Sequence, residues 1–151
     1  MDSSSTSVSC RRVADAHIVV VGLGPGGPDL VTTGTLAAIE ACSRRHLRTT
    51  RHPAASVVPD ASSFDEVYDE ADTLDEVYPR IVDLLIEEAT QHGEVLYAVP
   101  GSPSVAERTV ELLLAEAASP APRCRVTVVP ALSFLDLTWV RLGIDPVARG
   151  V

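Results

Sequence analysis

The feature that most constrains the fold is an apolar run followed at once by a glycine-rich loop. The run is Ile18 to Val21, and the loop, Gly22 to Asp29, holds four glycines and two prolines. Consecutive β-branched residues predict a strand buried on both faces, as in the centre of a parallel sheet. The glycines let the chain turn sharply and leave room beside the backbone. Because ligands of open parallel sheets bind beyond the carboxyl ends of the strands, a binding site is expected at this loop.

Strand and helix signals alternate along the rest of the chain. Further strands are predicted over 46–49, 94–99 and 125–129, and helices over 30–42, 64–70, 74–93, 104–118 and 134–142. This alternation predicts an α/β fold with a parallel sheet and helices on both faces. Short loops at 22–28, 100–103 and 130–133 each follow a strand, so in a parallel sheet they are expected at the same edge.

Several helix starts carry a hydroxyl residue with an acidic residue three positions later, the pattern of a capping box. The predicted pairs are Ser63 with Glu66, Thr73 with Glu76, Ser104 with Glu107 and Ser133 with Asp136, and Ser102 is an alternative cap for the helix over 104–118.

Length and charge restrict the classes of partner. The chain has 151 residues, which suits one domain over 17–146 after a serine-rich tail, Met1–Ala16, that we expect to be disordered. A net charge of −9 argues against nucleic acid as a partner. No apolar run is long enough to span a membrane. Cys10, Cys42 and Cys124 lack metal-ligand spacing, which predicts no metal site and a reducing, cytoplasmic setting.

The glycine loop also satisfies the dinucleotide-binding pattern G-x-G-x-x-G over 22–27. Pro25 and Pro28, however, supply no backbone N–H for a pyrophosphate. The second predicted strand also lacks the carboxylate that would bind a ribose. An NADP-binding Rossmann domain that uses Arg48 or Arg51 remains an alternative, as does a loop whose glycines serve only a tight turn.

Three of these loops together resemble a known family. Gly22–Asp29 resembles the opening motif of the tetrapyrrole (corrin/porphyrin) methylases. Val99–Pro103 is similar to that family's Gly-Asp-Pro loop with serine for aspartate, and Val129–Ser133 to its Pro-Gly-x-Ser loop with alanine for glycine. More narrowly, the chain resembles the methylase-like domain fused to MazG nucleotide pyrophosphohydrolases, over 47–53, 64–68, 97–109 and 133–136.

The resemblance implies an S-adenosylmethionine-dependent methyltransferase, with S-adenosylhomocysteine as product. In the family the cofactor lies between an N-terminal parallel α/β domain and a second domain, usually in a homodimer. The sequence to Val151 corresponds to the first domain, and we expect the second domain and any MazG domain to be absent from it. The cofactor-binding residues implied are Gly24, Pro25, Gly26, Pro100, Gly101, Ser102, Val105, Ala131, Leu132 and Ser133.

Arg48, Arg51 and His52 form one compact basic group at a predicted strand end. Two arginines can hold the carboxylates of a tetrapyrrole or the phosphates of a nucleotide in a bidentate manner, so this group is the predicted binding site for a small-molecule acceptor. Alternatively, the arginines pair with the acidic helices between Asp65 and Glu76. A non-catalytic ligand-binding module that regulates an attached pyrophosphohydrolase is the second functional hypothesis.

Overall fold

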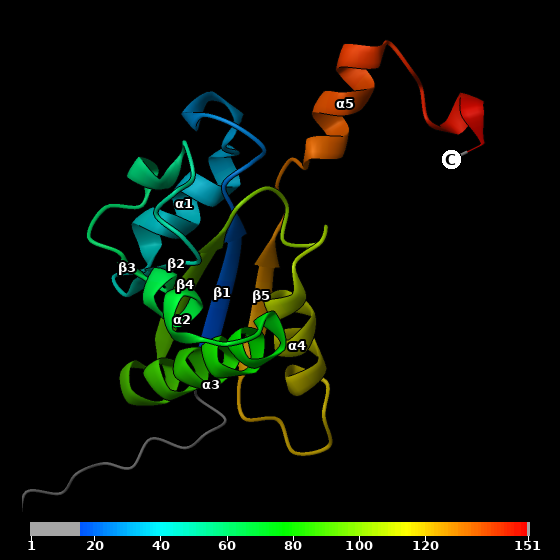
Figure 1. Cartoon of the computed structure of the whole chain (residues 1–151). Coiled ribbons are helices and arrows are strands. Elements are labelled where there is room, and N and C mark those ends of the chain that lie inside the picture. Colours follow the sequence, from blue (N-terminus) through cyan, green and yellow to red (C-terminus); the bar gives the residue numbers. More distant parts are fainter. Residues whose placement is uncertain (1–15, 151) are drawn as a thin grey trace, which may run out of the picture.

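The computed structural model describes residues 16–150, and the chain forms a five-stranded sheet in which every pairing is parallel. The strand order is β3-β2-β4-β1-β5, so β1 lies inside the sheet, between β4 and β5 (Figure 1). The strands are β1 His17–Gly22, β2 Arg45–Leu47, β3 Ser62–Ser63, β4 Glu94–Val99 and β5 Arg125–Val129. The predicted tail lies outside the described residues except for Ala16, which is buried and accepts a hydrogen bond from the backbone N–H of Arg125.

Helices cover both faces of this sheet, which confirms the predicted architecture (Figure 1). Helix α1 packs on one face, and α2, α3 and α4 pack on the other. The helices are α1 Thr33–Ala41, α2 Asp65–Glu70, α3 Leu74–His92, α4 Arg108–Ala117 and α5 Phe134–Leu142, with short 3-10 turns η2 Pro28–Leu30, η3 Ala55–Val57 and η4 Val147–Arg149.

The central strands separate two hydrophobic clusters because successive side chains point to opposite faces. Ile18 and Val20 of β1 belong to the cluster under α3 and α4, which includes the fully buried Leu85. Val21 belongs to the opposite cluster, with Ile39 of α1. Burying a side chain of this size stabilises the fold by about 1.5–3 kcal/mol.

The loops that follow β1, β4 and β5 meet at one edge of the sheet, as predicted. The register pairs Gly22 with Val99, so β1 and β4 end together. Beyond the strands, Gly24 and Gly101 exchange two backbone hydrogen bonds of 3.1 and 2.9 Å, and both have positive φ (+73° and +66°). A Cβ on Gly22 would lie 2.3 Å from the carbonyl oxygen of Gly101. This close approach explains why the first loop needs glycine.

Local capping signals predict some helix starts and fail at others. The capping box of Ser133 and Asp136 forms at the start of α5, as predicted. Thr73 is the N-cap of α3, but its side chain makes no capping bond. The predicted Ser63 box is also absent, because α2 begins at Asp65 and the Ser63 hydroxyl bonds to the side chain of that residue.

The start of α4 differs most from the prediction. The helix begins at Arg108, four residues later than expected, and neither Ser102 nor Ser104 caps it. Ala106 has φ +55°, outside the helical region, which prevents the helix from extending back towards the strand. The residue before the helix, Glu107, has a buried side chain that pairs elsewhere.

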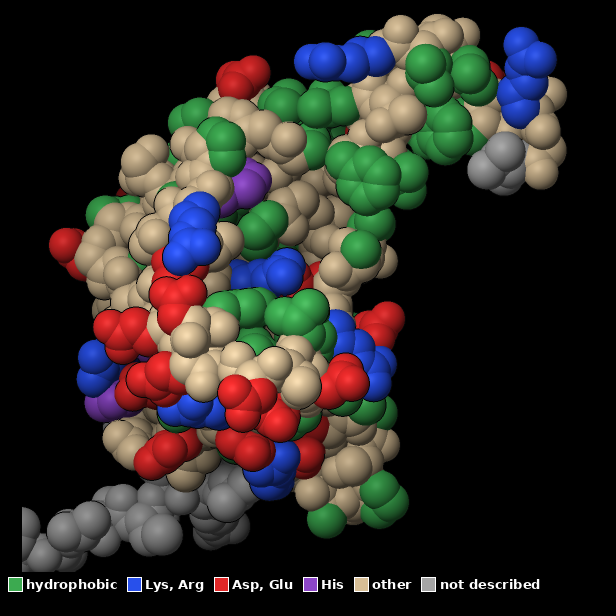
Figure 2. Space-filling view, in the orientation of Figure 1, with side chains coloured by type: hydrophobic (Ala, Val, Ile, Leu, Met, Phe, Trp, Pro, Cys, Tyr) green, Lys and Arg blue, Asp and Glu red, His purple; other side chains and the backbone are tan. Residues whose placement is uncertain are grey.

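Helix α5 projects from the body of the domain beyond β5 (Figure 1). None of its residues, 134–142, all within the described chain, is classed as buried. Phe134, Val140 and Leu142 are more than half exposed, and apolar side chains are visible along this segment in Figure 2. Trp139, on the same helix, is partly buried. Among residues 16–150, the helices are too short or too polar to cross a membrane.

Candidate functional site

Two adjacent pockets lie at the edge where the strand-end loops meet, and Pro100 borders both. The first, here called the loop pocket, has a volume of about 250 Å³, and the second, the arginine pocket, about 280 Å³. Sites that enclose a whole drug-sized ligand typically measure about 300–1,000 Å³, so each pocket fits part of a ligand. The loop pocket is lined by Pro25, His52, Pro100, Gly101, Ser102, Val105, Ala106, Ser133 and Phe134. The arginine pocket is lined by Arg48, Thr49, Arg51, Asp65, Tyr68, Asp69 and Pro100.

The loop pocket brings together most of the residues predicted to bind a cofactor. Pro25, Pro100, Gly101, Ser102, Val105 and Ser133 all line it. The other four predicted residues, Gly24, Gly26, Ala131 and Leu132, belong to the same loops but are outside its lining. Thus three segments that are distant in sequence form one concave surface from backbone groups and small side chains.

His52 lies in the loop pocket and not with the arginines, although the three were predicted as one group. Its Nδ1 accepts a hydrogen bond of 3.2 Å from the backbone N–H of Ala54, which leaves Nε2 as the protonated nitrogen of the neutral ring. Burial lowers the pKa of His52 below its ordinary value. The loop pocket is therefore lined by uncharged groups at neutral pH.

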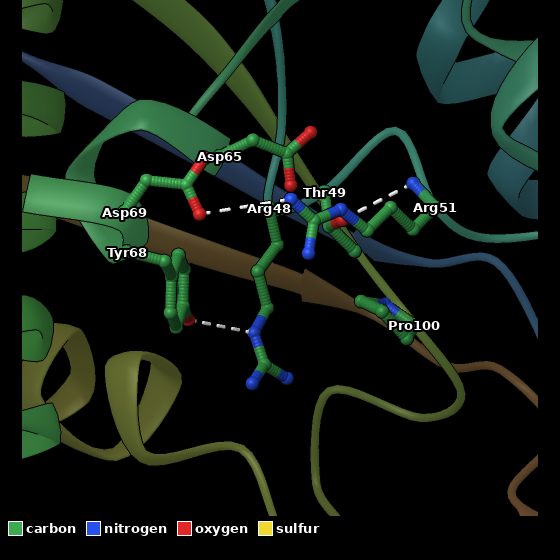
Figure 3. Close-up of a pocket in the computed structure, with 7 residues that line it drawn as sticks. All are labelled: Arg48, Thr49, Arg51, Asp65, Tyr68, Asp69 and Pro100. Atoms are coloured by element: carbon green, nitrogen blue, oxygen red, sulfur yellow. Dashed lines mark hydrogen bonds and ion pairs between the residues drawn. The ribbon is translucent and has the colours of Figure 1, made fainter.

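The two arginines of the second pocket have different environments (Figure 3). Arg48 donates from Nε to the Tyr68 hydroxyl over 2.9 Å and from Nη1 to Glu107 over 2.7 Å. Arg51 is 74% exposed and lies 3.6 Å from Asp69. Figure 3 shows the two guanidinium groups pointing in different directions. Arg51 is consequently the more accessible cation of the pocket.

The alternative prediction was that both arginines pair with the acidic helices. It is correct for Arg51 and wrong for Arg48. Asp69 of α2 is the partner of Arg51. Arg48 reaches Glu107, which lies outside the predicted acidic stretch 65–76. Breaking this pair is expected to cost much more free energy of unfolding than breaking a surface pair, because the Glu107 side chain is only 2% exposed.

Asp65 fixes the loop that carries the arginines. Its Oδ2 accepts hydrogen bonds from the backbone N–H and the hydroxyl of Thr50, at 2.9 and 2.6 Å. Partial desolvation opposes ionisation, but hydrogen bonds from Thr49, Thr50 and Ser63 outweigh it and hold the pKa of Asp65 well below its usual range. Asp65 is thus a carboxylate that anchors the loop throughout the neutral range.

Sequence reasoning missed seven residues of the site: Thr49, Asp65, Tyr68, Asp69, Ala106, Glu107 and Phe134. Tyr68 and Asp69 follow Asp65 at helical spacings of three and four, which places the three on one face of α2. That spacing could have indicated them. Glu107 gave no such signal, because a helix was expected to run through its position.

A family model described as "Tetrapyrrole (Corrin/Porphyrin) Methylases" matches residues 17–151. Among curated proteins, the chain is 37% identical over 134 residues to "Uncharacterized protein YabN" of Bacillus subtilis (strain 168). That alignment covers 86% of this chain and 27% of YabN. The chain thus spans about a quarter of this relative.

Solved structures share the fold. Uroporphyrin-III C-methyltransferase from Thermus thermophilus superposes with a TM-score of 0.64 at 21% identity, covering 87% of this chain and 54% of that one. A crystal structure of the same Thermus thermophilus enzyme complexed with S-adenyl homocysteine gives a TM-score of 0.52 at 22% identity, covering 79% and 46%. This chain therefore spans about half the length of these structures.

Proposed function

Because the chain belongs to the tetrapyrrole (corrin/porphyrin) methylase family, we propose that it forms one side of an S-adenosylmethionine site in a methyltransferase. One observation carries this proposal: the loops at 22–28, 100–106 and 130–134 converge on a single uncharged pocket at the carboxyl edge of the sheet. Binding of S-adenosyl homocysteine by a solved enzyme of the same fold supports the choice of cofactor.

The residues of the loop pocket suit the demands of methyl transfer. A bound sulfonium cofactor supplies an activated methyl group, so the protein contributes mainly orientation and exclusion of water. Gly101 has no side chain to obstruct its backbone groups, and an added Cβ would meet nothing within 4 Å. We expect Pro100, Gly101 and Ser102 to hold the methionine part, and 131–133 to approach the sugar or the adenine.

The arginine pocket is the proposed acceptor site. Donor and acceptor must come within about 3–3.5 Å of each other for methyl transfer, and the two pockets share Pro100. The exposed guanidinium of Arg51 can bind the carboxylate of a tetrapyrrole or the phosphate of a nucleotide-like acceptor. A site for NADP receives less support, because Arg48 is bound to Glu107 and the loop pocket is lined by uncharged groups.

The assignments to a MazG-linked protein, to a homodimer and to the cytoplasm rest on the sequence resemblance and on the fraction of its relative that the chain spans. We propose that the chain corresponds to the methylase-like part of a MazG-type pyrophosphohydrolase, in keeping with its 27% coverage of YabN. A homodimer in the cytoplasm is proposed on the same basis. The exposed apolar residues of α5 are available for contact with a further domain or subunit.

Calorimetric titration tests the cofactor assignment. S-adenosylmethionine, S-adenosylhomocysteine and NADP are titrated into this chain and into a version extended past Val151. We expect the first two to bind, more tightly in the extended chain, and NADP not to bind. If both versions bind neither sulfur compound, the methyltransferase assignment is wrong and the non-catalytic module is favoured.

A matched pair of glycine variants locates the cofactor. Gly101→Ala adds a methyl group in the loop pocket, whereas Gly143→Ala adds one after α5. Both glycines have positive φ (+66° and +62°), and neither added Cβ meets an atom within 4 Å, so the conformational penalty is similar. We expect S-adenosylhomocysteine affinity to fall about tenfold in Gly101→Ala only. Equal affinities would place the cofactor elsewhere.

A further inference from the structure

A buried acidic side chain lies directly behind the loop pocket. Glu107 follows Val105 and Ala106, which line the pocket, and it is the residue before α4. The residue is 4% exposed, and its Oε2 accepts a hydrogen bond of 2.7 Å from Arg48. Glutamate is almost never fully buried unless it is paired. The pair therefore joins the loop after β4 to the end of β2.

The backbone beside Glu107 has a conformation that needs support. Ala106 has φ +55°, where its Cβ crowds the backbone. Such conformations persist only where surrounding contacts hold them. Within the loop, Val105 donates its backbone N–H to the carbonyl of Ser102, and Ser104 donates its N–H to the Ser102 hydroxyl. The Arg48–Glu107 pair holds the other end of the same turn.

The Glu107 carboxylate has Arg48 as its charged partner and Thr109 as a second polar neighbour. Its Oε1 is buried and has no hydrogen-bond partner among residues 16–150, and the same is true of the Tyr97 and Thr109 hydroxyls. Burial raises the pKa of Glu107, and the neighbouring Arg48 and, to a smaller extent, Thr109 oppose this. Loss of Arg48 or of the carboxylate would therefore leave a buried polar group without its main partner.

We propose that Glu107 is a positioning residue that acts through Arg48 to hold the 102–106 turn in the shape that lines the loop pocket. The identification of the ligand of the loop pocket as S-adenosylmethionine rests on the function proposed above. The role of Glu107 in ordering the turn does not depend on that function. Because Arg48 also lines the arginine pocket, this one ion pair supports both halves of the site.

The test combines a ligand-free and a ligand-dependent measurement. Amide hydrogen exchange of residues 104–106 is recorded in the free chain, and S-adenosylhomocysteine affinity is measured at a temperature where every variant is folded. The variants are Glu107→Ala, which removes the contact, and Glu107→Gln, which keeps an oxygen that can accept from Arg48. The matched control is Glu111→Ala, in the first turn of α4, whose exposed carboxylate pairs with Arg108 at the same distance of 2.7 Å.

In Glu107→Ala we expect exchange in the turn to be about tenfold faster, with α4 and β4 still protected, and cofactor affinity to be about fivefold lower. Glu107→Gln should restore part of the exchange protection of the turn and part of the cofactor affinity, and Glu111→Ala should change neither quantity. If Glu107→Ala does not fold, the same two measurements on Glu107→Gln, compared with those on Glu111→Ala, decide the question. Unchanged exchange at 104–106, or acceleration spread evenly over the domain, would overturn the positioning role. Faster local exchange in a chain that binds no cofactor would support that role and contradict the proposed function.

Discussion

The two pockets at the carboxyl edge adjoin at Pro100 but are built from different chemical groups. The loop pocket is lined by uncharged groups, and its loops are packed around Gly22 and Gly24, whose neighbours leave no room for a Cβ. The arginine pocket consists of charged side chains, two cations and two carboxylates, partly open to solvent. The first should therefore respond to added volume and the second to altered charge. Four predictions, made with three variants, test this contrast.

The largest effect is expected from Arg48→Met, because it leaves the buried Glu107 without its cation. Breaking a buried pair in this way typically costs 3–5 kcal/mol, and since Arg48 is 26% exposed we expect a loss of about 3 kcal/mol in the free energy of unfolding, measured by urea denaturation. The control is Arg51→Met, which breaks an exposed pair and should cost less than about 1 kcal/mol. Equal losses would mean that the two arginines are equivalent.

The same variant has a predicted pH dependence. Burial raises the pKa of Glu107 in the folded state, so its contribution favours folding most below the unfolded pKa and is lost as the pH rises through the folded pKa. Without Arg48 the folded pKa rises further. The difference in stability between Arg48→Met and the parent chain should accordingly be smaller near about pH 5 than near about pH 8. A difference that grows on acidification would contradict this assignment.

Gly22→Ala is expected to have an intermediate effect, where the loops that form the loop pocket pack together. The added Cβ would lie 2.3 Å from the Gly101 carbonyl oxygen, a backbone atom that cannot turn aside. Overpacking of this kind typically costs about 1–3 kcal/mol, and the midpoint of thermal unfolding should fall accordingly. Gly34→Ala is the control, since its nearest contact would be an ordinary 3.6 Å to Val129. Similar midpoints for both would show that the loops can separate freely.

The smallest effect is expected from Asp65→Asn, in the arginine pocket. The amide loses the charge that accepts two hydrogen bonds from Thr50, and we expect a loss of about 1 kcal/mol. Because the pKa of Asp65 is depressed, its contribution is present above the unfolded pKa and is lost as the pH falls through the folded pKa. The loss should therefore be undiminished from neutral pH to about pH 5. Asp69→Asn, which removes the ion-pair partner of the exposed Arg51, is the control.

Much of the fold could be predicted because the signals were local and strong. Strands β4 and β5 have the predicted boundaries, since each is an apolar run that ends in proline. Strand β3 was missed because Ser62 and Ser63 have no preference for strands and pair with β2 only in the folded sheet. The late start of α4 was missed for a related reason: the side chain of Glu107 serves a distant residue instead of its own helix.

The site could be predicted only in part, for the same physical reason. Loops that follow parallel strands must meet, so the loop pocket was expected from topology alone. Which arginine is accessible depends on partners that are far apart in sequence, and this grouping of Arg48, Arg51 and His52 was divided by the fold between two pockets. Sequence proximity thus predicted the residues of the edge but not their roles.

The reciprocal hydrogen bonds of Gly24 and Gly101 tie together loops that leave different strands. These hydrogen bonds can form only when β1 and β4 lie side by side, so the binding surface is complete only when the centre of the sheet has formed. A ligand that contacts both loops then binds the finished sheet in preference to any partly assembled form. By mass action, such a ligand raises the free energy of unfolding of the whole domain by RT ln(1 + [L]/Kd).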